Sequence, residues 1–137
     1  VLGVEWSADQ SQIAYMAGTP TQVFVANRDG SNPRRVTGSP DRQTFNPAWS
    51  PDGTTLVYNL YQRPTKGPTL WTIGSNGTSN RSIASDGIRG QFSADGQWIA
   101  YLDGRGVDTP SSPGGSAYYA RVCKSRPDGS GVMVLAR

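Results

Sequence analysis

Short apolar segments separated by polar turns run through the whole chain. Near its middle, Leu56 and Tyr58 alternate with the period of two that one face of a β-strand requires. The turn sequence Ser-Pro-Asp-Gly at residues 50–53 precedes this segment, and the hairpin signal Asn76-Gly77 follows it. The pattern predicts a unit of four strands. The first strand ends near residue 49, the second covers residues 55–59, the third covers about residues 69–74, and the fourth runs through Ile83.

This unit occurs three times. The first blocks of the three units align without gaps and start 43 residues apart, at residues 6–15, 49–58 and 92–101. A second block follows in each unit, at residues 23–30, 70–77 and 122–129. Six positions after the last Gly of each second block stands an aliphatic residue: Val36, Ile83 and Leu135. Internal repetition of two blocks in the same order indicates a repeat architecture.

The size of the unit predicts the fold. Four-stranded units of about 40–45 residues are typical of β-propeller blades. We therefore predict an all-β chain of three four-stranded antiparallel blades, over about residues 1–43, 44–86 and 87–137. Closed propellers typically have about four to eight blades. The three blades are accordingly expected to form part of a larger ring of about six or more blades, or of an assembly.

Several of these residues carry a family resemblance. The segment Pro-Ala-Trp-Ser-Pro-Asp-Gly at residues 47–53, followed by an apolar strand, and Arg-Arg-Val-Thr at 34–37 resemble the WD-like, WSPDG-containing repeat of TolB-type β-propellers. The same repeat occurs in the propeller domains of prolyl-oligopeptidase-like hydrolases. The resemblance covers essentially the whole chain. It implies a propeller fold, a role in protein binding and a location outside the cytoplasm.

The first unit departs from the repeat at its first turn. Gln10 stands where the other units have Gly53 and Gly96, and Ala8 and Ala94 replace Pro51. A Gln at positive φ costs roughly 1 kcal/mol relative to Gly. We therefore expect the first turn to differ locally from the other two.

The connections between the second and third strands vary in length, unlike the short and uniform turns at the opposite end of each unit. They span about residues 17–21, 60–68 and 103–116. Variable loops on a rigid scaffold often carry binding residues, and the longest is either an ordered contact loop or a disordered insertion. Trp98 is a further candidate, because the equivalent residues Gln12 and Thr55 are polar. The candidate protein contacts are Tyr61, Arg63, Lys66, Trp98, Arg105 and Asp108.

The chain lacks the residues of common catalytic and metal sites. It contains no His, one Cys and no Gly-x-Ser-x-Gly segment, so we expect no Ser-His-Asp catalysis, no zinc site, no metal and no cofactor. The recurring Asp9, Asp52 and Asp95 fit turn hydrogen bonding better than calcium binding, since each turn offers one carboxylate. Cys123 aligns with large apolar residues and is expected to be buried.

The recurring aromatic residues Trp6, Trp49 and Phe92 could form a ladder for ligand stacking. Equivalent positions in successive blades more often pack between the blades, so we expect them in the core. Two sequons begin at Asn76 and Asn80, both at or beside a turn, and whether either is glycosylated stays open.

The charge of the chain is mild. It carries 13 basic and 10 acidic residues, a net charge of +3, without the dense basic stripe of a nucleic-acid-binding protein. We therefore expect no nucleic-acid partner. No stretch approaches the length of a membrane span, so we also expect no direct membrane span. Because the chain begins with Val1, we expect a processed product or a fragment.

Three blades leave two apolar faces without a neighbour. Large apolar faces are rarely exposed in soluble proteins, so we expect further blades or other protein subunits, including a second copy in a homodimer, to cover both ends. The leading functional hypothesis is a non-enzymatic protein-interaction scaffold, periplasmic or extracellular. The alternatives are the gating propeller portion of a prolyl-oligopeptidase-like hydrolase and a carbohydrate-binding propeller.

Overall fold

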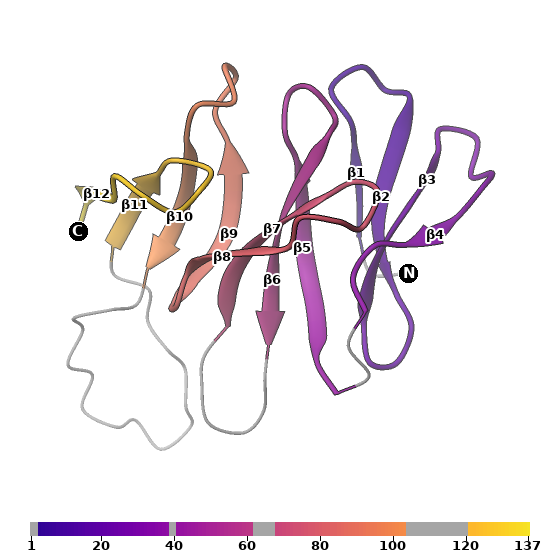
Figure 1. Ribbon diagram of the computed structural model, residues 1–137, viewed down its shortest axis with the longest axis horizontal. Helices are drawn as coiled ribbons and strands as arrows, with labels where there is room; N and C mark the ends of the chain where they lie inside the picture. The colour runs from indigo at the N-terminus through magenta and orange to yellow at the C-terminus, as the bar shows by residue number, and fades with distance from the viewer. Residues whose placement is uncertain (1–2, 39–40, 62–67, 104–120) are drawn as a thin grey trace.

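The computed structural model describes residues 3–38, 41–61, 68–103 and 121–137. These residues form three four-stranded antiparallel sheets, each with its strands in chain order (Figure 1). The sheets are β-propeller blades, as predicted, and they stand side by side in chain order. Among the described residues there is no helix long and apolar enough to cross a membrane.

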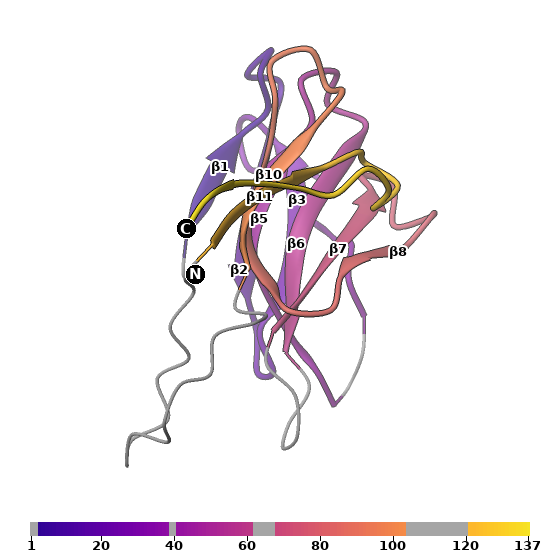
Figure 2. The same ribbon diagram turned by 90° about the vertical axis from the view of Figure 1, so that its left-hand side faces the viewer.

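Each blade takes its strands from one repeat unit. Blade 1 consists of β1 (Val4–Trp6), β2 (Gln12–Ala17), β3 (Gln22–Asn27) and β4 (Arg34–Arg35). Blade 2 consists of β5 (Gln43–Trp49), β6 (Thr55–Tyr61), β7 (Thr69–Gly74) and β8 (Arg81–Ala84). Blade 3 consists of β9 (Gly87–Phe92), β10 (Ile99–Asp103), β11 (Arg121–Ser125) and β12 (Met133–Ala136). In the second view the sheets are strongly twisted (Figure 2), as expected for propeller blades.

The core lies between the blades. We call the face of a blade that points toward the preceding blade its leading face, and the opposite face its trailing face. Alternation along each strand sends successive side chains to these two faces. On β6, Leu56 and Tyr58 point toward blade 1, while Val57 points toward blade 3. Each blade therefore contributes to the core through both faces.

Two apolar clusters result. Junction 1–2, between blades 1 and 2, buries Ala14, Val23, Val25, Val36, Leu56, Tyr58, Leu60 and Ile73, with Trp49 and Trp71 packed against them. Junction 2–3, between blades 2 and 3, buries Ala48, Val57, Leu70, Ile83, Ala84, Ile99, Tyr101 and Cys123, with Phe92 packed against them.

The structure corrects the expectation for one of the three recurring aromatic residues. Trp49 and Phe92 pack between blades as expected, but the Trp6 side chain is 53% exposed. Trp6 lies on the leading face of blade 1, which no described residue of the chain covers. The burial of Cys123, with none of its surface exposed, agrees with the prediction.

Polar side chains also link the blades. The fully buried Asn59 of blade 2 donates from Nδ2 to the carbonyl oxygen of Gly87 at 2.8 Å. Its Oδ1 accepts from the backbone N–H of Arg89 at 3.1 Å. At the other junction, the Thr44 N–H donates to the carbonyl oxygen of Thr21 at 2.8 Å. Because hydrogen bonds are directional and apolar contacts are not, these bonds specify how neighbouring blades are positioned.

Candidate functional site

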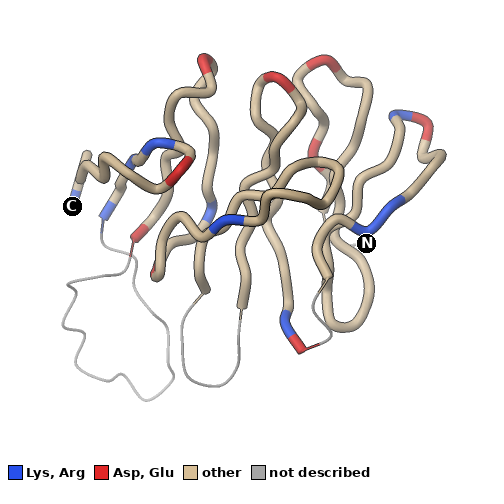
Figure 3. The backbone as a smooth tube through the Cα atoms, viewed as in Figure 1, with Lys and Arg blue, Asp and Glu red and all other residues tan. Residues whose placement is uncertain are grey.

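The first turn of each blade is built around an aspartate. In blade 2, the Asp52 carboxylate accepts from the Ser50 hydroxyl at 2.6 Å and from the Thr54 N–H at 3.0 Å. Asp9 and Asp95 accept equivalent bonds. Figure 3 shows acidic positions at the tips of these turns. The aspartates therefore build turns, as the sequence predicted, and each turn contributes one carboxylate.

These bonds favour the ionised carboxylates. The backbone N–H of Ser11 and the hydroxyls of Ser7 and Ser11 lower the pKa of Asp9 to about 2. Hydrogen bonds from the Ser50 hydroxyl and the Thr54 N–H lower the pKa of Asp52. The same arrangement lowers the pKa of Asp95. All three turns stay negatively charged at any physiological pH.

The first turn of blade 1 does not differ from the others, which corrects the expectation for Gln10. Gln10 adopts φ of 59°, close to 72° at Gly53 and 70° at Gly96. Its N–H donates to the Ser7 carbonyl oxygen at 2.9 Å, and Gly53 makes the same bond to Ser50 at 3.0 Å. The hydrogen bonds of the turn therefore hold Gln10 in a conformation that favours glycine.

Junction 1–2 is closed at its turn end by two side chains. The Arg34 guanidinium donates to the Ser75 carbonyl oxygen at 3.2 Å and to Gln12 Oε1 at 3.1 Å. The Trp49 indole N–H donates to the carbonyl oxygen of Glu5, also at 3.2 Å. Arg34 and Trp49 thus bridge blades 1 and 2 above the apolar cluster.

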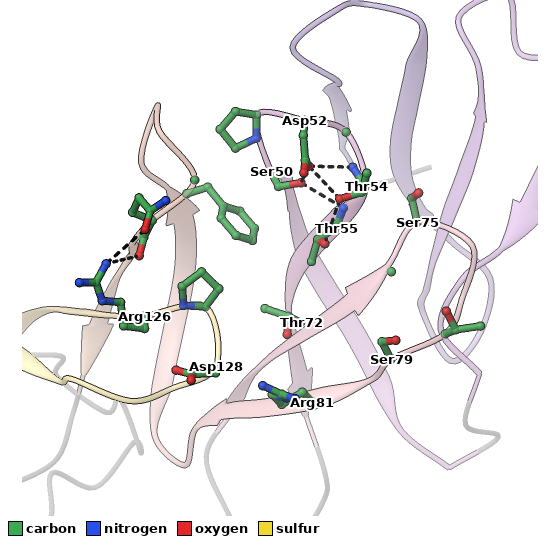
Figure 4. A pocket seen from close by; sticks show the side chains of 18 of the residues that line it. Ser50, Asp52, Thr54, Thr55, Thr72, Ser75, Ser79, Arg81, Arg126 and Asp128 are labelled. Atoms are coloured by element: carbon green, nitrogen blue, oxygen red, sulfur yellow. Dashed lines mark hydrogen bonds between the residues drawn. The ribbon is translucent and has the colours of Figure 1, made fainter.

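Junction 2–3 has different residues at two of the equivalent positions and is open at its turn end. Phe92 replaces Trp49 and has no N–H to donate, while Thr55 replaces Gln12 and is too short to reach the arginine. Arg81 occupies the position of Arg34, and the structure gives its guanidinium no hydrogen bond or ion pair to any described residue. A groove with a volume of about 1140 Å³ separates the turns of the two blades (Figure 4).

The groove combines three kinds of surface. Its apolar part comes from Pro51, Phe92 and Pro127. Its charged part comes from two cations and three carboxylates: Arg81, Arg126, Asp52, Asp95 and Asp128. Hydroxyl groups line much of the remainder, contributed by Ser50, Thr54, Thr55, Thr72, Ser75, Thr78 and Ser79. Such a lining suits a ligand with both apolar and hydrogen-bonding groups.

The elements of two blades position the groove's charged side chains. Arg81 begins β8, paired with Thr72 of β7, whose side chain is buried. Asp128 lies in the β11–β12 turn on the opposite wall, as Figure 4 shows. Hydrogen bonds from Ser130 lower the pKa of Asp128, with a smaller contribution from the positive charge of Arg81. The two charges attract one another across the groove without forming a direct ion pair.

The structure brings few of the predicted contact residues together. Tyr61 ends β6 at the loop end of blade 2 and is half-buried. Trp98 is half-buried at the turn end of blade 3, and the Lys124 ammonium and the Arg126 guanidinium each lie over its ring, 4.1 Å from a ring centroid. The other four candidates, Arg63, Lys66, Arg105 and Asp108, lie outside the described residues.

The sequence analysis missed the groove. A signal was available, because the alignment that identified the repeat also pairs Trp49 with Phe92 and Arg34 with Arg81. Only the structure shows that the first of each pair belongs to a bridge across a junction.

Within the described residues, no group of three His, Cys, Asp or Glu side chains is placed to hold a metal ion.

A partly buried ion pair lies at the end of blade 3 opposite its turns. Asp103, 1% exposed, accepts from the Arg121 guanidinium at 3.2 Å, and the Cys123 thiol lies 3.8 Å from the same carboxylate oxygen. This pair joins the ends of β10 and β11. We regard it as structural, because Arg121 satisfies the buried charge.

No family model matches the chain, but solved structures do. A TolB from Agrobacterium tumefaciens superposes with a TM-score of 0.74 at 20% identity, over 98% of this chain and 49% of TolB. A chain of the nidogen–laminin complex gives 0.71 at 14% identity, over 98% and 47%. The acylaminoacyl peptidase of Pyrococcus horikoshii gives 0.64 at 12% identity, over 99% and 25%.

The chain thus spans about half the length of the TolB and nidogen–laminin chains and a quarter of the peptidase. At these identities the likeness concerns the fold. The described residues form β-propeller blades of the kind found in TolB and in propeller-containing hydrolases.

Proposed function

We propose that the chain is a non-enzymatic scaffold that binds an extended segment of a partner protein in the groove of junction 2–3. The observation that carries this proposal is the open groove, where the equivalent crevice of junction 1–2 is bridged by Arg34 and Trp49. The fold, shared with TolB and with a chain of a two-protein complex, supports the same class of function.

The composition of the groove favours a peptide ligand. An extended peptide offers apolar side chains for Phe92 and the two prolines, and backbone groups for the hydroxyls. An acidic side chain or carboxyl terminus would pair with Arg81, since arginine binds carboxylates through two parallel hydrogen bonds.

The test is selection of a peptide followed by substitution of Arg81. Peptides are selected on the purified chain from a random display library, and their Kd values are measured by fluorescence anisotropy. We expect Arg81→Ala to weaken the selected peptides about tenfold or more, since it removes a charge-assisted contact. Arg28→Ala, in an exposed turn of blade 1 outside the groove, is the matched control and is expected to leave affinity unchanged. Equal affinity for wild type and Arg81→Ala would overturn the proposal.

Binding through the variable loops of the opposite end remains a prediction, because most of those residues lie outside the described parts of the chain. Tyr61→Ala tests it on the same peptides. An extracytoplasmic location is also part of this proposal, and it rests on the resemblance to TolB. Fractionation of the source cells into periplasmic, secreted and cytoplasmic material tests it directly.

The second candidate is the propeller portion of a hydrolase. The likeness to the Pyrococcus horikoshii acylaminoacyl peptidase favours it. In that case the coding sequence on one side of these residues contains an α/β-hydrolase segment with a Gly-x-Ser-x-Gly nucleophile elbow. Sequencing the surrounding reading frame distinguishes the two candidates.

A further inference from the structure

We propose that the two end faces of the chain bind each other in a second copy, head to tail, so that two copies close one propeller ring. This interaction is separate from the groove of junction 2–3 and does not depend on it. Inside the chain, equivalent residues cover the same faces of the internal blades.

The leading face of blade 1 repeats the residues that junction 1–2 buries. Blade 2 presents Trp49, Leu56, Tyr58 and Trp71 to blade 1, and the equivalent residues of blade 1 are Trp6, Ile13, Tyr15 and Phe24. Leu56 and Tyr58 are 0% and 2% exposed. On the uncovered leading face of blade 1, Tyr15 stacks on Phe24 with ring centroids 5.6 Å apart, and Trp6 is 53% exposed.

The trailing face of blade 3 likewise carries residues equivalent to those that the trailing faces of blades 1 and 2 bury in the internal junctions. Val23 and Leu70 are fully buried by the next blade, but the equivalent Val122 is 37% exposed. Val36 and Ile83 are 7% and 8% exposed, whereas the equivalent Leu135 is 53% exposed. The leading face of blade 1 and the trailing face of blade 3 thus carry counterparts of the two sets of side chains that pack together in an internal junction.

The hairpin glycines show how the blades touch. A Cβ on Gly77 would lie 3.4 Å from the Val36 carbonyl oxygen, and one on Gly129 would lie 3.0 Å from that of Ile83. Each glycine therefore rests on the backbone of the preceding blade at its recurring aliphatic residue. Gly30 is the equivalent in blade 1, and a Cβ there meets nothing within 4 Å. In a head-to-tail pair it would rest on Leu135 of the second copy.

The charges at the two ends are complementary. In junction 2–3, Arg81 of blade 2 faces Asp128 of blade 3. At the chain ends, Asp29 is the equivalent of Asp128, while Met133 replaces Arg81. The cation is supplied instead by Lys124, which stands where blade 2 has Thr72 in the same groove lining. Lys124 of one copy would therefore face Asp29 of the other.

A second copy is the occupant that these observations favour, since it brings both complementary faces at once. A head-to-tail contact has different surfaces on its two sides and forms a closed ring when the rotation between copies allows it. Two copies supply about six blades, within the four to eight of closed propellers. Each copy would then use both ends, and no apolar face would remain uncovered.

The test uses two exposed substitutions, one at each end. The mass of the chain is measured by light scattering at micromolar to submillimolar concentration, for wild type, Trp6→Arg and Leu135→Arg. We expect wild type at twice its 14.6 kDa chain mass and each variant at the single mass. An equimolar mixture of the two variants should recover the double mass in part, because the intact leading face of Leu135→Arg still fits the intact trailing face of Trp6→Arg.

Matched controls make the result interpretable. Ser85→Arg, in the exposed turn between β8 and β9 and away from both end faces, should retain the double mass, and the circular dichroism spectra of all variants should show the β-structure of wild type. A wild-type monomer at every concentration overturns the proposal and indicates that further blades or another protein cover the ends. Variants that stay dimeric, or that fail to complement each other in the mixture, overturn the head-to-tail arrangement. Peptide binding at Arg81 is measured independently, so this result leaves the proposed function standing or failing on its own.

Discussion

Junctions 1–2 and 2–3 have the same pattern of apolar packing, but only junction 1–2 is bridged by polar side chains at its turn end. In both, recurring side chains of one blade pack into the trailing face of the blade before it. Junction 1–2 adds the bridges of Arg34 and Trp49, whereas junction 2–3 leaves Arg81 in an open groove. The comparison separates two tasks of the repeat: the buried positions hold the blades together, and the turn-end positions decide whether a crevice can receive a ligand.

The largest expected effect tests whether the two junctions are equally well packed. Leu56 and Leu70 are both fully buried, one in each cluster. We expect Leu56→Ala and Leu70→Ala each to lower the free energy of unfolding by about 2–5 kcal/mol, through lost transfer energy and the cavity left behind. Urea denaturation of both variants measures this. A cost below about 1 kcal/mol at either site would mean that its junction is not a packed interface.

A smaller effect is expected from the polar link between blades 2 and 3. Asn59→Ala leaves the Gly87 carbonyl and the Arg89 N–H without their buried partner. We expect a loss of about 1–3 kcal/mol in the free energy of unfolding, the cost of unsatisfied buried polar groups. Asn27→Ala is the control, because its bond to the Ser31 hydroxyl is exposed. Equal costs for the two variants would argue against a role for Asn59 in holding the blades together.

The first turn of blade 1 offers a stabilising change. Gln10→Gly removes a side chain from a residue at φ of 59°. We expect a gain of about 0.5–1 kcal/mol, since glycine adopts this conformation without strain but loses more backbone entropy on folding. The reverse change, Gly53→Gln in blade 2, should destabilise by a similar amount. A lowered melting temperature for Gln10→Gly would show that the Gln10 side chain makes contacts that outweigh the strain.

The effects of pH are expected to be smaller still, beginning with acid. The pKa values of Asp9, Asp52 and Asp95 are lower in the folded chain than the ordinary 3.8. The unfolded chain therefore binds protons first as the pH falls, and stability should be complete above about pH 5 and decline toward pH 2. Unfolding curves at several pH values measure this slope. Asp9→Asn should make the slope shallower, and an unchanged slope would contradict the assignment.

A rise in pH is expected to lower stability through the ionisation of one tyrosine. Burial raises the pKa of Tyr58 from 10.0 to about 12, although its hydrogen bond to Asn80 opposes the shift. The unfolded chain ionises first, so stability present below pH 10 should be lost as the pH rises toward 12. Tyr58→Phe removes this titration and should flatten the alkaline part of the curve.

The blades could be predicted from the sequence because their construction is local. The strand over residues 69–74, the Asn76-Gly77 hairpin and the aspartate turns all follow from spacing and turn chemistry. The burial of Cys123 followed from alignment with Phe24 and Trp71. Each of these features depends on residues close in the sequence or on the same position of the repeat.

The groove could not be predicted in the same way, because it depends on contacts between units. The alignment shows that Phe92 replaces Trp49, but it does not show that Trp49 donates to the backbone of the blade before it. The exposure of Trp6 has the same origin: the residue type fits a core position, and only the arrangement of blades decides whether anything covers it. The turn at Gln10 was mispredicted because its hydrogen bonds outweigh the preference of one residue.

The most direct test of this account transfers the closure of junction 1–2 to junction 2–3. The double substitution Phe92→Trp with Thr55→Gln gives the groove an indole N–H that can reach the Ala48 carbonyl oxygen and an amide that can hold Arg81. Affinity for a peptide selected on the wild-type chain is then measured by fluorescence anisotropy. We expect the double variant to fold with at least wild-type stability and to lose the peptide. A stably folded double variant that binds the peptide as tightly as wild type would contradict this expectation.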